Sequence, residues 1–455
     1  MKKLLYLSCL MALSGCVAYG SADPSAQAPG PGPYAGGHPM GPPPEGMPPG
    51  PPPGGFPPGG PGSHQVITGD GAYVLSDAQV LKGGSYESSR DDENVIRAQG
   101  YVHATLDNVT VNKRSGIASS NEAASFYGLN AAVLALDHAD LIINGGSIHA
   151  LAQGATGVFA YDHALVHINH TKIDVSGGNA GGIEVAGGAT MYANDLNVHA
   201  RDKAAIRSDR GGGKIFVHGG SYTTAGRMGA PAIYSTADIK VSSAKLVSHD
   251  SEAVVIEGLN SVSLANSDVI GHMDGTNPGK DGANIRNVML YQSMSGDAQQ
   301  GTSTFSMSGG ALTSENGNMF YVTNTSSVIN LYNVYMHLAK SSKLLLVAGN
   351  DGKRGWGKVG ANGGHCTLNL SQQKLSGEIK VDGISDLTMN LAQSSDYQGA
   401  INPDGTKANV SVTLDDSSSW TLTHDSYIQH FHGSLSQVHL NGHKLYINGA
   451  LVQNS

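Results

Sequence analysis

Short apolar phrases return along this chain about every 25 residues, each with a large apolar residue near its centre. Successive central residues are separated by 25, 25, 23, 27, 21, 34, 31 and 25 positions. A repeat of this length is typical of a solenoid, in which each repeat forms one coil and buries its apolar face against the neighbouring coils. The central residues are Val133, Val158, Ile183, Ile206, Ile233, Val254, Val288, Met319 and Leu344.

Between these phrases, apolar and polar residues alternate in short runs such as 139–143 and 214–217. An alternation of period two predicts β-strands. Turn signals such as Gly219-Gly220 separate the runs, and glycine accepts the positive φ that tight corners require. Convincing helical stretches are nearly absent after the leader. These patterns predict an all-β fold, a right-handed parallel β-helix of roughly a dozen or more coils.

Changes in composition divide the chain into four parts. Sixteen of the 19 prolines fall in 24–62, which cannot bury a core and is expected to be a disordered tether biased toward the polyproline II conformation. Near residue 367 the strands become longer and alternate more cleanly. We therefore expect a signal peptide at 1–15, a lipidated cysteine and the tether at 16–62, the β-helix at 63–366, and its last coils with a C-terminal β cap at 367–455.

The first residues have the layout of a bacterial export signal, with two lysines ahead of the apolar stretch 4–13. The motif Leu13-Ser14-Gly15-Cys16 resembles a bacterial lipobox. This resemblance implies cleavage before Cys16 and attachment of lipid to its thiol and amine. Val17 stands where an aspartate often retains lipoproteins at the inner membrane of enteric-type bacteria, so the resemblance implies the outer membrane. An ordinary signal peptide that is cut elsewhere is the alternative.

Cysteine use and charge exclude several classes of function. Cys9 leaves with the signal and Cys16 carries the lipid, so Cys366 alone remains and no intramolecular disulfide or paired-cysteine zinc site is available. We expect Cys366 to be a buried thiol in a strand. The net charge of −9, without a basic tract, argues against nucleic acid as a partner. No cofactor is expected.

Two resemblances to known families rest on phrases in the second half of the chain. The stretch 417–427, with Leu440-Asn441-Gly442, resembles the end of an autotransporter passenger domain. In that family a membrane β-barrel follows the cap, whereas this chain ends at Ser455, which argues against self-secretion and leaves the lipid as the anchor. The phrases 251–258 and 320–325 resemble a bacterial family of β-helix surface lipoproteins. That resemblance implies the fold and no assigned reaction.

Parallel β-helices also host polysaccharide lyases and hydrolases, and one group of residues has suitable chemistry. If the central apolar residues point inward, the residues one and three positions later face outward and stack from coil to coil. The first row then contains Glu184, Arg207 and Tyr234, and the second contains Asp209 and Glu257. Such carboxylates beside an arginine are suited to general acid and base work on a sugar or uronate. A surface ladder of opposite charges explains the same pattern.

Histidines form a second candidate. Asp137-His138 and Asp162-His163 stand 25 residues apart, so the repeat places them on neighbouring coils. Imidazole and carboxylate suit zinc, copper or nickel, and a transition-metal site is one interpretation. The next coil has Gly187-Gly188 at this place, which favours the other interpretation, a solvated turn.

These features predict an adhesin-like binding protein, anchored by lipid in the bacterial outer membrane with its β-helix on the cell surface. Long solenoid faces suit extended ligands such as glycans or matrix proteins. Tyr234 and Tyr291, together with Tyr161 and Tyr192, are candidates for stacking on sugar rings if they are exposed. An envelope polysaccharide lyase or glycoside hydrolase that uses the carboxylate group is the alternative. A periplasmic orientation and a passive envelope component also stay open.

Overall fold

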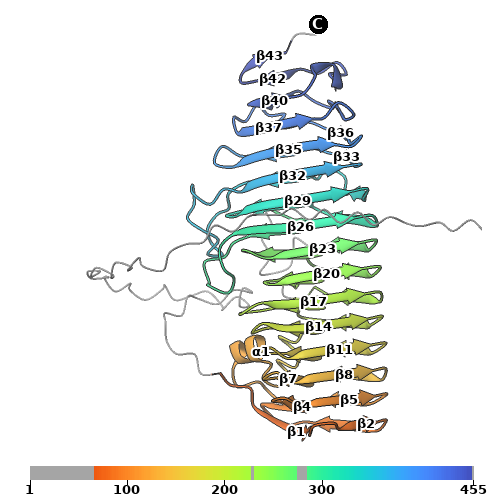
Figure 1. Cartoon of the computed structure of the whole chain (residues 1–455). Helices are drawn as coiled ribbons and strands as arrows, with labels where there is room; N and C mark the ends of the chain where they lie inside the picture. The colour runs from red at the N-terminus through yellow and green to blue at the C-terminus, as the bar shows by residue number, and fades with distance from the viewer. Residues whose placement is uncertain (1–65, 227–229, 274–283, 453–455) are drawn as a thin grey trace, which may run out of the picture. The chain divides into compact units, whose positions relative to one another are not determined.

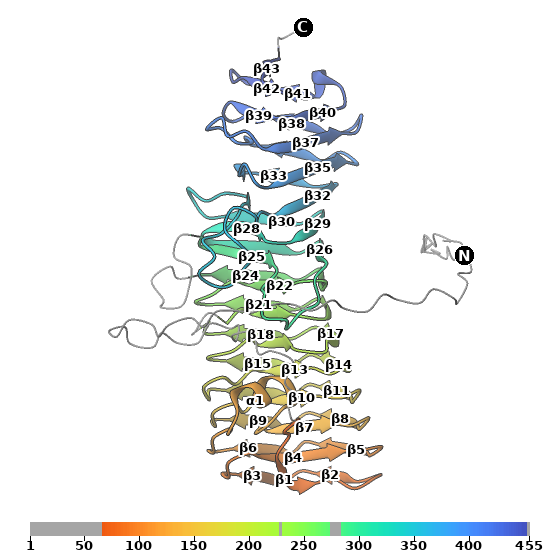
Figure 2. The same ribbon diagram turned by 90° about the vertical axis from the view of Figure 1, so that its left-hand side faces the viewer.

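The computed structural model describes residues 66–226, 230–273 and 284–452. In these residues about half of the chain is strand and 3% is helix. Figures 1 and 2 show coils stacked in sequence order, and the first ten coils each contribute one strand to each of three parallel sheets, called A, B and C here. This is the right-handed parallel β-helix that the repeat predicts.

Sheet A contains the central apolar residues of the repeat, and sheet B contains the alternating runs. The strands of sheet A are β1 (Asp70–Val74), β4 (Glu93–Gln99), β7 (Val133–Leu136), β10 (Val158–Ala160), β13 (Ile183–Val185), β16 (Ile206–Ser208), β19 (Ile233–Ser235), β22 (Val254–Glu257), β25 (Arg286–Tyr291), β28 (Asn318–Thr323), β31 (Leu345–Val347) and β34 (Ile379–Val381). The strands of sheet B are β2 (Val80–Lys82), β5 (His103–Asp107), β8 (Asp140–Asn144), β11 (Leu165–Asn169), β14 (Ala189–Asn194), β17 (Gly213–His218), β20 (Asp238–Ser242), β23 (Ser261–Ala265), β26 (Thr302–Ser308), β29 (Ser326–Tyr332), β32 (His365–Ser371), β35 (Asp386–Ala392), β37 (Asn409–Leu414) and β40 (His430–His432).

The third side of each coil is sheet C up to β30, and a four-stranded sheet takes its place further on. The strands of sheet C are β3 (Ser85–Ser88), β6 (Thr110–Lys113), β9 (Ser147–Ala150), β12 (Lys172–Val175), β15 (Asn197–Ala200), β18 (Ser221–Thr224), β21 (Lys245–Ser248), β24 (Asp268–His272), β27 (Ala311–Asn316) and β30 (Tyr335–Leu338). The four later strands are β33 (Lys374–Ser376), β36 (Asp396–Gln398), β38 (Ser419–Thr421) and β41 (Val438–His439).

The predicted register of sheet A is confirmed over seven coils and is wrong by one residue in the next two. Val133, Val158 and Ile183 are direct neighbours, and the row continues to Val288. Val288 then pairs with Phe320 and Phe320 with Leu345, instead of the expected Met319 and Leu344. Both expected residues are themselves buried, so alternation does not identify the inward residue at these places.

The described part of the chain contains one short α-helix that the sequence pattern did not predict, α1 (Asn121–Tyr127). Ser120 caps it by accepting a hydrogen bond from the Ala123 amide, and Gly128 ends it with a φ of 74°. At seven residues it is too short to show a helical period. Figures 1 and 2 place α1 beside β7 and β10, over the outer side of sheet A.

The last coils run to β41 and end in a different arrangement. β39 (Ser426–Ile428) pairs with β42 (Leu445–Ile447), which pairs in antiparallel fashion with β43 (Ala450–Leu451). A short 3-10 helix, η2 (Leu435–Gln437), closes a corner with a capping box. Cys366 lies in β32 as a buried thiol, as predicted, and burial raises its pKa to about 12.

Candidate functional site

The first row of outward side chains predicted from the repeat exists. Glu184 on β13 is the direct neighbour of Arg207 on β16, and Arg207 is the neighbour of Tyr234 on β19. Glu257 at the end of β22 neighbours Tyr291 on β25. Since strand side chains alternate and Ile206 faces the core, these residues lie on the outer side of sheet A.

Their predicted exposure is wrong, because other segments cover this part of sheet A. Glu184 and Glu257 are 0% and 1% exposed, and Tyr234 and Tyr291 are 7% and 5% exposed. The cover consists of α1, the segment 292–299 after β25, and Trp356, whose ring centroid lies 5.0 Å from that of Tyr291. The charged residues therefore do not form a surface ladder. Tyr234 and Tyr291 are too buried to stack on a sugar ring.

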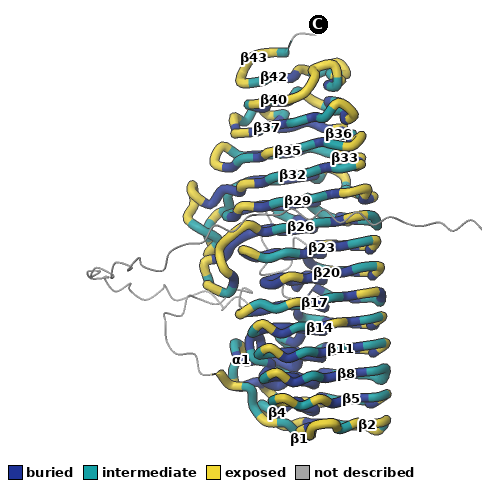
Figure 3. Tube along the Cα trace, in the orientation of Figure 1, coloured by how far each residue is buried: buried dark blue, intermediate teal, exposed yellow. Residues whose placement is uncertain are grey.

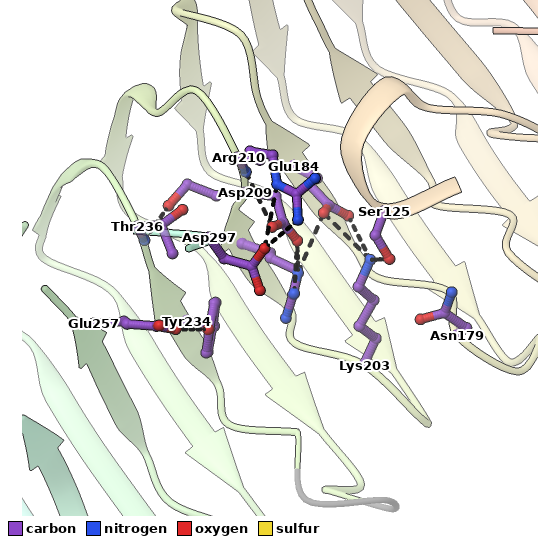
Figure 4. A network of polar contacts seen from close by, with 12 residues as sticks. Ser125, Asn179, Glu184, Lys203, Asp209, Arg210, Tyr234, Thr236, Glu257 and Asp297 are labelled. Atoms are coloured by element: carbon purple, nitrogen blue, oxygen red, sulfur yellow. Dashed lines mark hydrogen bonds and ion pairs between the residues drawn. The ribbon is translucent and has the colours of Figure 1, made fainter. Parts of the chain in front are cut away.

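Glu184 sits opposite two cations. Its carboxylate accepts hydrogen bonds from Thr156 at 3.1 Å and from Lys203 Nζ at 3.2 and 3.3 Å, and Arg207 Nε lies 3.3 Å away. Lys203 also donates to Ser125 of α1 at 3.2 Å, as Figure 4 shows. Burial raises the pKa of Glu184 despite these cations, and burial lowers the pKa of Lys203.

A second set of charges continues from Arg207. Arg207 donates to Asp209 Oδ2 at 2.8 and 2.6 Å, and its guanidinium carbon lies 4.3 Å from the ring centroid of Tyr234. Arg210 donates to Asp297 and lies 4.0 Å over the ring of Phe126 in α1. Burial opposes the charge of Arg207, but Asp209 and Glu184 outweigh it and raise its pKa. Arg210, two residues after the end of β16, therefore contacts both covering segments, α1 and 292–299.

Among the described residues, the carboxylate of Glu257 accepts hydrogen bonds from hydroxyl groups only. Tyr234 and Ser293 donate short hydrogen bonds to it, and Tyr291 donates one of 2.8 Å. Figure 4 shows Tyr234 pointing at this carboxylate. Burial raises the pKa of Glu257, although the three hydrogen bonds oppose the shift. Burial also keeps the pKa of both tyrosines well above 10.

The sequence pattern missed the partners that complete this network. Lys203, Arg210, Ser293 and Asp297 lie in connections between strands, where the repeat length varies and no period marks them. A clue was available in the connection after Tyr291, because the coil that contains it has 31 residues, more than three strands need.

The arrangement is a closed network. Each of the three carboxylates named from the sequence, Glu184, Asp209 and Glu257, accepts hydrogen bonds from at least two protein donors. General acid and base catalysis needs groups within hydrogen-bond reach of the sugar. Carboxylates with 0–1% exposure do not meet this condition here. The hydrogen bonds of this network instead hold α1 and the segment 292–299 against the outer side of sheet A.

The histidine pairs occupy one corner of successive coils. Asp137-His138, Asp162-His163 and Gly187-Gly188 all have φ between 50° and 78°, the conformation of two consecutive left-handed turn residues. The rings of His138 and His163 stack with centroids 5.2 Å apart. This confirms the turn interpretation. In 66–226, 230–273 and 284–452 no group of three or more His, Cys, Asp or Glu side chains is placed to hold a metal.

The outer side of sheet B carries a row of stacked rings. His167, Tyr192 and Phe216 lie face to face, with both centroid distances 4.9 Å. Because each face of Tyr192 is covered by a neighbouring ring, this residue presents its edge to solvent. Tyr161 packs against Tyr127 of α1, with centroids 5.3 Å apart. Tyr192 therefore does not offer the free ring face that stacking on a sugar requires.

Sheet B also contains an open groove of about 640 Å³ that the sequence analysis did not identify. It crosses seven strands from β14 to β32, or about 30 Å at ~4.8 Å per coil. Small side chains hollow its middle, and aromatic rings stand at both ends. One row of lining residues is Tyr192, Phe216, Lys240, Ser263, Ser306, Asn330 and Asn369, and the other is Asn194, His218, Ser242, Ala265, Ser308, Tyr332 and Ser371.

The comparisons add no assignment. No protein-family model, no curated protein and no solved structure matches this chain. Cys16, the predicted lipidation site, lies outside the described residues. Of the helices in the described part of the chain, none is long and apolar enough to cross a membrane.

Proposed function

We propose that this protein is a surface-anchored, adhesin-like binding protein of the bacterial outer membrane that holds an extended glycan in the groove of sheet B. The observation that carries the proposal is the groove itself, because it is long and open, and because its mainly apolar surface carries hydroxyl and amide groups from several coils. Matrix proteins remain the second ligand class that a long solenoid face would suit.

The groove offers polar groups along a mainly apolar surface, and the two together suit the hydroxyl groups and the ring faces of a glycan. The side chains of Ser263, Ser306 and Asn330 offer donors and acceptors at the spacing of the coils, which repeats every ~4.8 Å. In the described residues no carboxylate lines the groove, and Lys240 is its one lysine. A neutral or acidic glycan therefore meets no like charge. Tyr332, which is 44% exposed, marks the far end with an accessible ring.

The anchoring half of the proposal rests on the lipobox at Cys16 and on the proline-rich stretch behind it. A lipid at Cys16 would hold the chain to the membrane, and an extended tether of ~3.1 Å per residue would carry the β-helix away from the lipid surface. Many coils on one scaffold would then face a polymer, so several weak contacts would act together.

Blocking the groove tests the ligand class. Ser263→Arg places a long cation in the middle of the groove, and Thr223→Arg on the outer side of sheet C is the matched control. Both variants and the parent chain are applied to an array of oligosaccharides of four or more sugars. We expect the parent and Thr223→Arg to bind the same glycans and Ser263→Arg to lose at least tenfold in affinity. Equal binding by all three chains would refute the groove.

The alternative activity, a polysaccharide lyase or hydrolase, depends on Glu184, Arg207, Asp209 and Glu257. Their burial and their saturation with internal partners give it less support than the open groove gives to binding. Release of reducing or unsaturated ends from envelope polysaccharides by the parent chain, and its absence with Glu257→Gln, would favour the enzyme.

A further inference from the structure

The first coil of the β-helix is open on its outer side. β1, β2 and β3 pair with β4, β5 and β6 respectively, and no described strand pairs with their other edges. Figure 1 shows β1 and β2 at the end of the stack with no described segment beyond them. Unpaired edges of this kind are templates for further strands.

The hydrophobic core is also open at this end. Tyr73 stands in the inward row, in register with the fully buried Ile96, yet it is 41% exposed. Beside this open end, Val74 and Val80 stand in register with Arg97 and Thr105 in the outward rows and are 62% and 49% exposed. Tyr86 packs edge-to-face on Tyr73 with centroids 5.0 Å apart, so two tyrosines lie across the end of the core. Figure 3 shows exposed residues along β1 and β2.

The opposite end is finished differently. β43 adds an antiparallel strand to β42, and η2 closes a corner with its capping box. Strand pairing of the first coil with that end of another copy would therefore meet an antiparallel strand at β43, next to the last strands of two parallel sheets, β40 and β41. The surface that best matches the open first coil is another open first coil.

Composition argues against cover by the preceding part of the same chain. Residues 24–62 hold sixteen prolines, which have no N–H to donate to an edge strand, and almost no large aliphatic side chains. We propose that two copies associate head to head through β1, β2 and β3. A two-fold axis across β1 pairs this strand with its own copy in antiparallel fashion and covers Tyr73 and Val74 in both chains.

The test uses the full chain with Cys9→Ser and Cys16→Ser, which removes lipid and stray thiols, while buried Cys366 stays unreactive. Sedimentation equilibrium measures its mass between 1 and about 100 µM, a range that brackets weak dimers. We expect a reversible dimer. Val74→Lys with Val80→Lys should weaken dimerisation at least tenfold, and Leu451→Lys, 48% exposed at the other end, should leave it unchanged.

A cross-linking measurement keeps the proposal falsifiable if a variant misfolds. Asp77→Cys in the first coil and Asp416→Cys near the last coils are each treated with a short bismaleimide. Covalent dimers should form with Asp77→Cys and not with Asp416→Cys. A monomer at every concentration, or equal cross-linking at both ends, would overturn the head-to-head dimer.

Discussion

At the residue scale, Glu257 is the most informative side chain, because its environment separates a structural role from a catalytic one. It is 1% exposed and takes hydrogen bonds from Tyr234, Tyr291 and Ser293. Glu257→Ala leaves three buried hydroxyls without this acceptor and opens a cavity, so we expect a loss of about 3 kcal/mol in stability and a lower Tm. Thermal unfolding by circular dichroism measures it, with the exposed Glu315→Ala as control. An unchanged Tm would contradict the structural role.

The raised pKa of Glu257 predicts a pH dependence of stability. Burial favours the protonated carboxyl in the folded chain, so between the unfolded pKa near 4.5 and the raised folded pKa the folded state binds more protons than the unfolded state. The contribution of Glu257 to the free energy of unfolding is fully present below that pH window and decreases as the pH rises through it. The Tm of Glu257→Gln minus that of the parent should therefore increase from about pH 4 to pH 8. A difference that decreases would contradict the burial of a proton here.

At the same scale, the turns at Asp137-His138 and Asp162-His163 predict that the stability of the fold does not depend on a bound metal. Asp162-His163 adopts the backbone of Gly187-Gly188 on the next coil, so glycines fit the same turn. We expect Asp162→Gly with His163→Gly to change stability by about 1 kcal/mol or less. Added Zn²⁺ or Ni²⁺ should shift the Tm of the parent and of this double variant equally. A metal-dependent gain in the parent alone would restore the metal site.

At the scale of the element, sequence reasoning succeeds where period and burial agree. Ile183, Ile206 and Ile233 fill one inward row because each is flanked by polar or small residues that mark its direction. The same reasoning fails at Met319, where five successive residues of β28 are buried and alternation disappears. It also fails for the outward row, since α1 and 292–299 come from other coils and their packing on sheet A leaves no period in the sequence.

The groove escaped sequence reasoning for a related reason. The base of the groove is ordinary strand. Its shape comes from small residues such as Ser263, Ala265 and Ser308, which stand between larger residues on neighbouring coils, such as Lys240 and Tyr332. A single coil shows only a serine in a strand. The hollow becomes visible only when the register of seven coils is known.

At the scale of the whole molecule, the described chain is a one-dimensional stack in which each coil contacts chiefly its two neighbours. Stability in such a stack is close to a sum over coils and interfaces, so a coil is removable if the register of its neighbours is kept. The C-terminal coils are the place to test this, because residues 386–408 lie outside both the buried charge network and the groove.

The register predicts the length of the removable piece. Asp386 pairs with His365 and Asn409 pairs with Asp386, so deletion of the 23 residues 386–408 brings Asn409 into the place of Asp386 beside β32. Leu375 then faces Trp420, because both stand in the column of Tyr397. We expect this variant to keep its strand spectrum with a Tm lower by a few degrees. Deletion of 386–396 alone removes β35 without bringing the next strand into its place, so the junction beside β32 loses its register and that variant should lose most of its cooperative unfolding. If both deletions unfold alike, the additive view of the stack fails, and the C-terminal coils must act as one cooperative cap.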